Sequence, residues 1–99
     1  FFVDVTTPTA IVPLGKLPTA TAPSVWRDIK VYRDHAFIVS EAPGHGMQVF
    51  SLARLRGLAA DGARRFEADA RYTGIGNAHN IVINEATGFA YANGASTTM

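Results

Sequence analysis

The stretch WRDIKVYRDHAFIVSEAPGHGMQVFSL, residues 26–52, contains three β-strand patterns in succession. β-Branched and aromatic residues are frequent in all three runs, as is typical of strands. Arg33-Asp34 separates the first run from the second, and the Pro43-Gly44-His45-Gly46 segment separates the second from the third. Both separators are rich in turn-forming residues. The stretch therefore predicts three antiparallel strands, at 26–32, 35–40 and 47–52.

Similar short runs continue on both sides of this stretch. Earlier in the chain we expect strands at 1–6 and 11–17, and Pro13 marks the second of these as an edge strand because proline cannot donate to a sheet. Later in the chain we expect strands at 65–72, 79–84 and 89–93. Leucines 52, 55 and 58 are spaced by three, which predicts a short helical insertion near 52–58. The fold class predicted is all-β.

The totals limit the class of protein. Ninety-nine residues suit one small domain, and 47% hydrophobic residues with 17% charged residues are typical of a globular chain. The net charge of +1 argues against a nucleic-acid partner, and the absence of cysteine excludes disulfides and thiolate metal sites. The sequence has no apolar run of the roughly 18 residues that span a bilayer, so no membrane insertion is expected in this segment.

An internal repeat organises these strands. Residues 2–5 (FVDV) align with 49–52 (VFSL), residues 28–31 (DIKV) with 80–83 (NIVI), and residues 36–38 (AFI) with 90–92 (AYA). The helical insertion near 52–58 lies between residues 28–31 and their copy at 80–83. A repeat of four strands has the size of one blade of a β-propeller.

This register divides the chain into parts of three blades. Residues 1–17 are the last two strands of one blade, 26–72 are a complete four-stranded blade with the insertion, and 79–93 are the first two strands of the next. Open strand edges at both ends would favour aggregation. We therefore expect a single-domain excerpt of about two blades, whose partners include the remaining blades of a parent chain.

Several of these segments resemble a known family. Asp4-Val5-Thr6-Thr7-Pro8 followed by Ile11-Val12-Pro13-Leu14-Gly15 resembles the LVIVD repeat of bacterial β-propellers. The segments 26–56 and 78–94 are similar to the choice-of-anchor B family, which is built from such repeats. Ser51 departs from the pattern, because the repeat usually carries Asp there, as at Asp4.

The resemblance implies a location and a kind of function. Members of this family are secreted or held at the bacterial cell surface and have no established enzyme activity. The sequence thus predicts an extracytoplasmic module for protein or glycan binding or scaffolding, and a simple surface spacer is a further possibility. The alternative is a metal-dependent enzyme or a metal-binding propeller with its site at the mouth of the channel.

Blade topology predicts which polar residues share a surface. The loops that enter the inner strand and those that join the second and third strands lie on one face of a propeller. The candidate binding face consists of Arg27, Asp28, Glu41, His45, His79, Asn80 and Asn93. His35 and Glu85 are expected on the opposite face, and His35 aligns with Phe89, which favours a packing role for its ring.

The strongest candidates for a metal site are His79, Asp28 and His45. Neutral imidazole and carboxylate suit a divalent ion such as Zn, Mn or Fe, so a divalent metal is a possible cofactor. Two simpler interpretations stay open. Asp28 and Asn80 could accept hydrogen bonds from backbone amides in turns, and His45 could be an exposed imidazole in a Gly-His-Gly turn, with Glu41 as its partner if it is functional.

Overall fold

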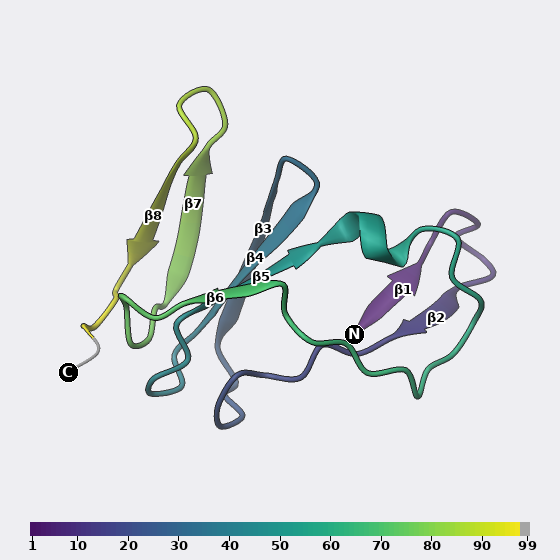
Figure 1. The fold of residues 1–99 in the computed structure, drawn as a ribbon, viewed down its shortest axis with the longest axis horizontal. Coiled ribbons are helices and arrows are strands. Elements are labelled where there is room, and N and C mark those ends of the chain that lie inside the picture. The colour runs from purple at the N-terminus through teal and green to yellow at the C-terminus, as the bar shows by residue number, and fades with distance from the viewer. Residues whose placement is uncertain (98–99) are drawn as a thin grey trace.

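The computed structural model describes residues 1–97 and is all-β (Figure 1). Its strands in chain order are β1 (Phe2–Asp4), β2 (Val12–Gly15), β3 (Arg27–Tyr32), β4 (His35–Ser40), β5 (Met47–Ser51), β6 (Ala70–Tyr72), β7 (Asn80–Asn84) and β8 (Phe89–Asn93). A short 3-10 helix, η1 (Leu52–Leu55), follows β5. Over the same residues, no helix is long and apolar enough to cross a membrane.

The strands form three antiparallel sheets that stand side by side (Figure 1). The central sheet has the order β3-β4-β5-β6, so each strand pairs with its neighbour in the chain. The β1–β2 pair lies on one side of this sheet and the β7–β8 hairpin lies on the other. None of the three sheets closes on itself. Because a strand buries both faces only between two layers, this arrangement explains why β4 is apolar along nearly its whole length.

The β3–β4 hairpin is fixed by a two-residue turn. Arg33 and Asp34 both have positive φ, 46° and 61°. Two consecutive residues of positive φ match the twist of the flanking strands in a tight hairpin. Asp34 tolerates this conformation better than most residues, and its carboxylate also accepts two hydrogen bonds from Arg56, of 2.6 and 2.7 Å.

Two apolar contacts join the sheets. Between the central sheet and β7–β8, Val39, Ala78 and Ile81 are almost fully buried, and Phe37, Met47, Ile75, Ile83 and Ala92 pack against them. On the other side, the ring of Phe2 in β1 stacks on Phe50 in β5 with centroids 4.7 Å apart. Phe66 meets both rings edge-on. Aromatic pairs of this geometry add to the free energy of area burial.

Some predicted elements are shorter in the structure. The strand expected at 65–72 is wrong in its first half, because β6 covers only Ala70–Tyr72. Arg65 instead forms an isolated parallel bridge with Lys16. The carboxylate of Asp69 accepts a 2.6 Å hydrogen bond from the Ser51 amide. In a longer β6, this amide would donate to a backbone carbonyl instead. The helical insertion is a single 3-10 turn, and Ile11 and Leu17 lie outside β2.

Candidate functional site

The ends of four strands bring polar residues together at one end of the sheets. Arg27 begins β3 and pairs with Ser40 at the end of β4. Asn80 begins β7 and pairs with Asn93 at the end of β8. Because β3 lies beside β7, both hairpins present these ends to the same side. Glu41 and His79 immediately flank the strands, so they belong to the same cluster of loops.

Trp26, Glu41 and His79 form the most distinctive contact at this end. The indole of Trp26 stacks on the imidazole of His79 with centroids 4.5 Å apart and planes 11° from parallel. His79 Nδ1 lies 2.5 Å from Glu41 Oε1, which fixes the orientation of the ring. The side chains of His79 and Glu41 are 45% and 44% exposed, and Trp26 is 47% exposed. We call these three residues the Trp26 cluster.

Backbone contacts hold the Trp26 cluster in place. The amide of Glu41 donates to the Trp26 carbonyl over 3.2 Å, and the side-chain amide of Asn77 donates to the Glu41 carbonyl over 3.1 Å. The amide of His79 donates to the carbonyl of Asn93 over 3.0 Å. Each member is therefore held at a strand end or in a loop by at least one backbone hydrogen bond, as a preorganised binding surface requires.

Asp28 joins two sheets. Its Oδ2 accepts a 3.0 Å hydrogen bond from the Ile81 amide in β7, and its Oδ1 accepts a 2.9 Å bond from the Ile29 amide. Both carboxylate oxygens also lie 2.9 Å from Lys30 Nζ. The Ile81 amide is the main cause that lowers the pKa of Asp28, and Lys30 acts in the same direction. These contacts agree with the amide-bonding interpretation of this residue.

His45 lies inside the protein, so the expected exposure of its imidazole is wrong. The residue is fully buried, and Nδ1 lies 2.9 Å from the carbonyl oxygen of Gly46. Arg71 covers the loop, since its Nε and Nη2 donate to the carbonyls of His45 and Gly44 over 2.9 and 2.5 Å. Among residues 1–97, His45 Nε2 has no hydrogen-bond partner.

The surroundings of His45 favour the neutral ring. Burial lowers the pKa of His45, and the positive charges of Arg27 and Arg71 act in the same direction. The Gly46 carbonyl, which bonds Nδ1, opposes this shift. A buried histidine with a lowered pKa carries no charge at neutral pH, so a packing role suits His45. His45 is not bonded to Glu41, because the Glu41 carboxylate bonds His79 instead.

The remaining predicted residues lie where the strand register puts them. Asn80 Oδ1 accepts a 2.9 Å hydrogen bond from Asn93 Nδ2, which joins the two side chains across the start of β7 and the end of β8. His35 lies at the other end of β4, where its Nδ1 is 2.7 Å from the Arg33 carbonyl. Glu85 is exposed in the β7–β8 turn at that same end.

The described part of the chain contains no group of three or more His, Asp or Glu side chains that could hold a metal ion. The structure does not bring His79, Asp28 and His45 together. His79 bonds Glu41, and Asp28 bonds Lys30 and two backbone amides. His45 is buried in its own loop.

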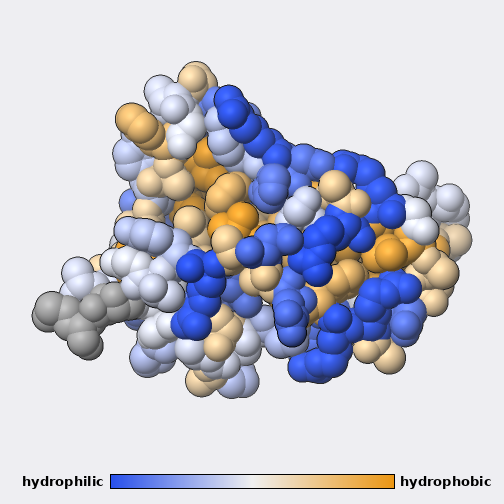
Figure 2. All heavy atoms as spheres, viewed as in Figure 1, coloured by the Kyte–Doolittle hydropathy of each residue, from blue (hydrophilic) through white to orange (hydrophobic). Residues whose placement is uncertain are grey.

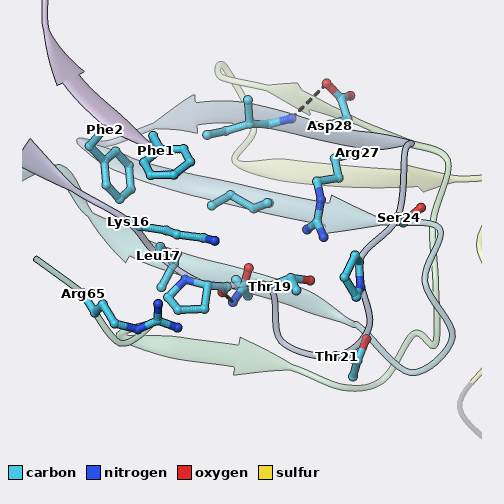
Figure 3. Close-up of a pocket in the computed structure, with 15 residues that line it drawn as sticks. Phe1, Phe2, Lys16, Leu17, Thr19, Thr21, Ser24, Arg27, Asp28 and Arg65 are labelled. Carbon is cyan, nitrogen blue, oxygen red and sulfur yellow. Dashed lines mark hydrogen bonds between the residues drawn. The ribbon is translucent and has the colours of Figure 1, made fainter. Parts of the chain in front are cut away.

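A hollow of about 790 Å³ lies on the face of the central sheet that looks toward β1–β2 (Figure 3). Ile29, Ile38 and Gln48 are among its lining residues. The labelled side chains of Lys16 and Arg27 point into it. The side chains of Lys16, Arg27 and Arg65, which all line this hollow, make no hydrogen bond or ion pair with residues 1–97. Thr19 Oγ1, also in the lining, is buried without a partner among those residues.

Sequence reasoning did not select Trp26 and Asn77 as site residues. Packing between sheets is a sufficient explanation for an aromatic residue beside a strand, so the sequence does not single out Trp26. The available signal was its position directly before Arg27 and Asp28, in the loop that enters the predicted inner strand. Chemically, the Trp26 cluster offers an aromatic surface beside a carboxylate and an imidazole. No protein-family model, curated protein or solved structure matches this chain.

Proposed function

We propose that this chain is a non-catalytic, extracytoplasmic binding module, part of a β-propeller of the LVIVD-repeat, choice-of-anchor B type. One observation carries the proposal. Two hairpins that align in sequence, β3–β4 and β7–β8, stand side by side and direct the same ends of their strands to one surface. Successive blades around a propeller axis have this relationship. The resemblance described above supports a cell-surface or secreted location.

The ligand surface is the Trp26 cluster. A half-exposed indole offers a large, rigid apolar face, and tryptophan is enriched at binding hot spots. Glu41 and His79 lie beside it with acceptor and donor atoms, and Asn77 is bonded to the same loop. Sugars present apolar C–H faces together with hydroxyls, so this composition favours a glycan, while a protein partner is the other ligand class considered.

The test is binding of the labelled chain to an array of bacterial cell-surface glycans. The expected result is a restricted set of glycans whose binding falls by about tenfold or more in Trp26→Ala. Phe89→Ala is the matched control, because Phe89 is also exposed but pairs with Asn84 at the opposite end of the hairpin. Equal binding by Trp26→Ala and the unmodified chain contradicts the proposed surface. Binding only to a protease-sensitive component points to a protein partner instead.

A further inference from the structure

The contact between the central sheet and β7–β8 joins two hairpins, β3–β4 and β7–β8, whose sequences are repeats of each other. In this contact, the Asp28 carboxylate accepts from the Ile81 amide, and the Ile81 side chain belongs to one buried cluster with Val39. The side chains of Phe37 and Ile83 pack against that cluster. The first strand of the later hairpin thus covers one face of the earlier hairpin. Between its two sides the contact includes an apolar cluster and one charge-assisted hydrogen bond.

The strand registers show which residues are equivalent in the two hairpins. Ile29 pairs with Ile38 in the earlier hairpin, and Ile81 pairs with Ala92 in the later one. On the opposite faces of the hairpins, Lys30 pairs with Phe37, and Val82 pairs with Tyr91. The sequence repeat aligns these same positions, so Ile29 corresponds to Ile81, Tyr91 to Phe37 and Asn80 to Asp28.

Each hairpin uses one face in this contact. Its other face is uncovered, and it is equivalent to the face that the other hairpin uses. On the earlier hairpin it is the face of Ile29, Val31 and Ile38, which we call the head face. Ile29 is 50% exposed and Val31 is 53% exposed. On the later hairpin it is the face of Asn80, Val82 and Tyr91, which we call the tail face. Val82 is 50% exposed and Tyr91 is 51% exposed, and Figure 2 shows apolar residues at the surface over this part of the molecule.

We propose that the head face of one copy of this chain binds the tail face of a second copy, repeating the internal contact. This inference rests on the propeller arrangement proposed above, and it is independent of the glycan ligand. Tyr91 would take the place of Phe37, against Ile29 and Ile38. The hollow beside these isoleucines provides room for the larger tyrosine ring.

The polar part of the contact is also repeated. In the internal contact the acceptor is the Asp28 carboxylate and the donor is the Ile81 amide. At the new contact the acceptor is Asn80 Oδ1 and the donor is the Ile29 amide, which gives up its present 2.9 Å hydrogen bond to Asp28 Oδ1 while Lys30 stays bonded to that oxygen. Asn80 Oδ1 already accepts one hydrogen bond from Asn93, but an amide oxygen has two lone pairs and accepts a second.

The symmetry of the association follows from these assignments. Head and tail are different surfaces, so the contact is heterologous, and each dimer keeps one free head and one free tail. Association therefore continues beyond the dimer, either to a ring or to an open chain. A symmetric dimer would use the same face twice and would stop at two copies.

The experiment measures mass by light scattering after size exclusion, over a wide range of protein concentration. The unmodified chain is expected to grow in mass with concentration and to pass the mass of a dimer. Ile29→Lys blocks the head and Tyr91→Lys blocks the tail, because each places an unpaired charge in an apolar contact. Each variant alone is expected to stay monomeric, with association weakened by about tenfold or more.

The mixture of the two variants is the decisive sample. It retains one intact tail, on Ile29→Lys, and one intact head, on Tyr91→Lys, so it is expected to form a dimer and nothing larger. Ile11→Lys is the control, since Ile11 is 59% exposed outside both faces, and it should associate like the unmodified chain. Circular dichroism checks folding, and Val31→Lys with Val82→Lys provides a second pair.

Three results overturn the proposal. The first is a mixture that stays monomeric while the unmodified chain associates, and the second is continued dimerisation of Ile29→Lys alone. The third is an unmodified chain that stays monomeric at every concentration. The glycan test above is separate, because Trp26→Ala leaves both faces intact and Ile29→Lys leaves the Trp26 cluster intact.

Discussion

The carboxylate of Asp28 accepts a hydrogen bond from the backbone amide of Ile81 across the boundary between two sheets, over 3.0 Å. The two residues are the second residue of β3 and of β7. Ile81 is nearly fully buried, so its amide has no access to water as an alternative partner. This one bond links the first strands of two consecutive hairpins and sets their relative position along the strand direction.

Replacing Asp28 should weaken the contact between the sheets. Asp28→Ala leaves the buried Ile81 amide without an acceptor, so we expect a loss of about 1–3 kcal/mol in the free energy of unfolding. Asp28→Asn keeps an acceptor oxygen without the charge and should lose less. Urea denaturation measures both. Asp61→Ala is the control, since within residues 1–97 the Asp61 carboxylate bonds only the nearby Ala63 amide and its loss should change stability little. Equal losses at Asp28 and Asp61 would contradict the linking role.

Stability should fall in acid because of Asp28 and Asp69. The Ile81 amide lowers the pKa of Asp28, and the Ser51 amide is the main cause that lowers the pKa of Asp69. The unfolded chain then binds protons at a higher pH than the folded chain. The stabilisation is complete above the unfolded pKa, about 4, and is lost as the pH falls through the folded values.

This acid dependence is checked by urea denaturation midpoints between neutral and strongly acidic pH. The double variant Asp28→Asn with Asp69→Asn should show a flatter decline than the unmodified chain. An unchanged slope in the double variant would assign the acid sensitivity to other groups.

His45 should produce a second pH dependence, at higher pH. Its folded pKa is lowered, mainly by burial, so between that value and about 6.5 the unfolded chain binds a proton that the folded chain does not. Stability is therefore complete above about 6.5 and decreases as the pH falls below it. His45→Phe keeps a buried ring without the titrating nitrogens, and it should remove the decrease.

Histidine substitutions elsewhere provide the control. His35→Gln leaves His45 in place and should retain the decrease in denaturation midpoint below pH 6.5. His45→Ala should lower stability by about 3 kcal/mol at neutral pH, because it empties a fully buried site. A His45→Phe chain with the same pH profile as the unmodified chain would refute the assignment.

The two glycines that flank His45 should differ sharply in their tolerance of alanine. Both have positive φ, 71° for Gly44 and 69° for Gly46, so each alanine adds backbone strain of about 1 kcal/mol. A Cβ on Gly44 meets open space, whereas one on Gly46 overlaps the carbonyl of Tyr72. Gly46→Ala should therefore lose about 2 kcal/mol or more and Gly44→Ala about half of that, as measured by thermal unfolding. Equal losses of stability in the two variants would contradict the close approach of the Tyr72 carbonyl in β6 to Gly46.

The strands that the sequence predicts best are those with local signals. The segments 35–40 and 89–93 have the predicted bounds, because turn residues end them on both sides and apolar residues fill them. The segment 65–72 was predicted too long. Its β-type residues are present, but the Asp69 carboxylate occupies the Ser51 amide and Arg65 pairs with Lys16, and neither partner is visible locally in the sequence.

The candidate site shows the same limit. The predicted bounds of the strands place Arg27 and Glu41 at one end of the first hairpin and Asn80 and Asn93 at one end of the second, and the strand pairings have the same arrangement. The burial of His45 was missed because a Gly-His-Gly turn normally exposes its side chain. Here Arg71, which is 26 residues away in the chain, bonds the loop carbonyls and closes it over the ring. Such contacts depend on tertiary packing and leave no periodic pattern.

The segment after η1 lies on the far side of the central sheet from β7 (Figure 1). Residues 56 and 57 and 59–63 are exposed, and a Cβ on Gly57 would meet nothing within 4 Å. A change in the length of the segment between η1 and β6 should therefore leave the hydrogen bond between Asp28 and Ile81 intact. A reporter domain spliced in after Gly57 would emerge at the outer edge, which makes this the natural position for labelling the chain while the Trp26 cluster stays free.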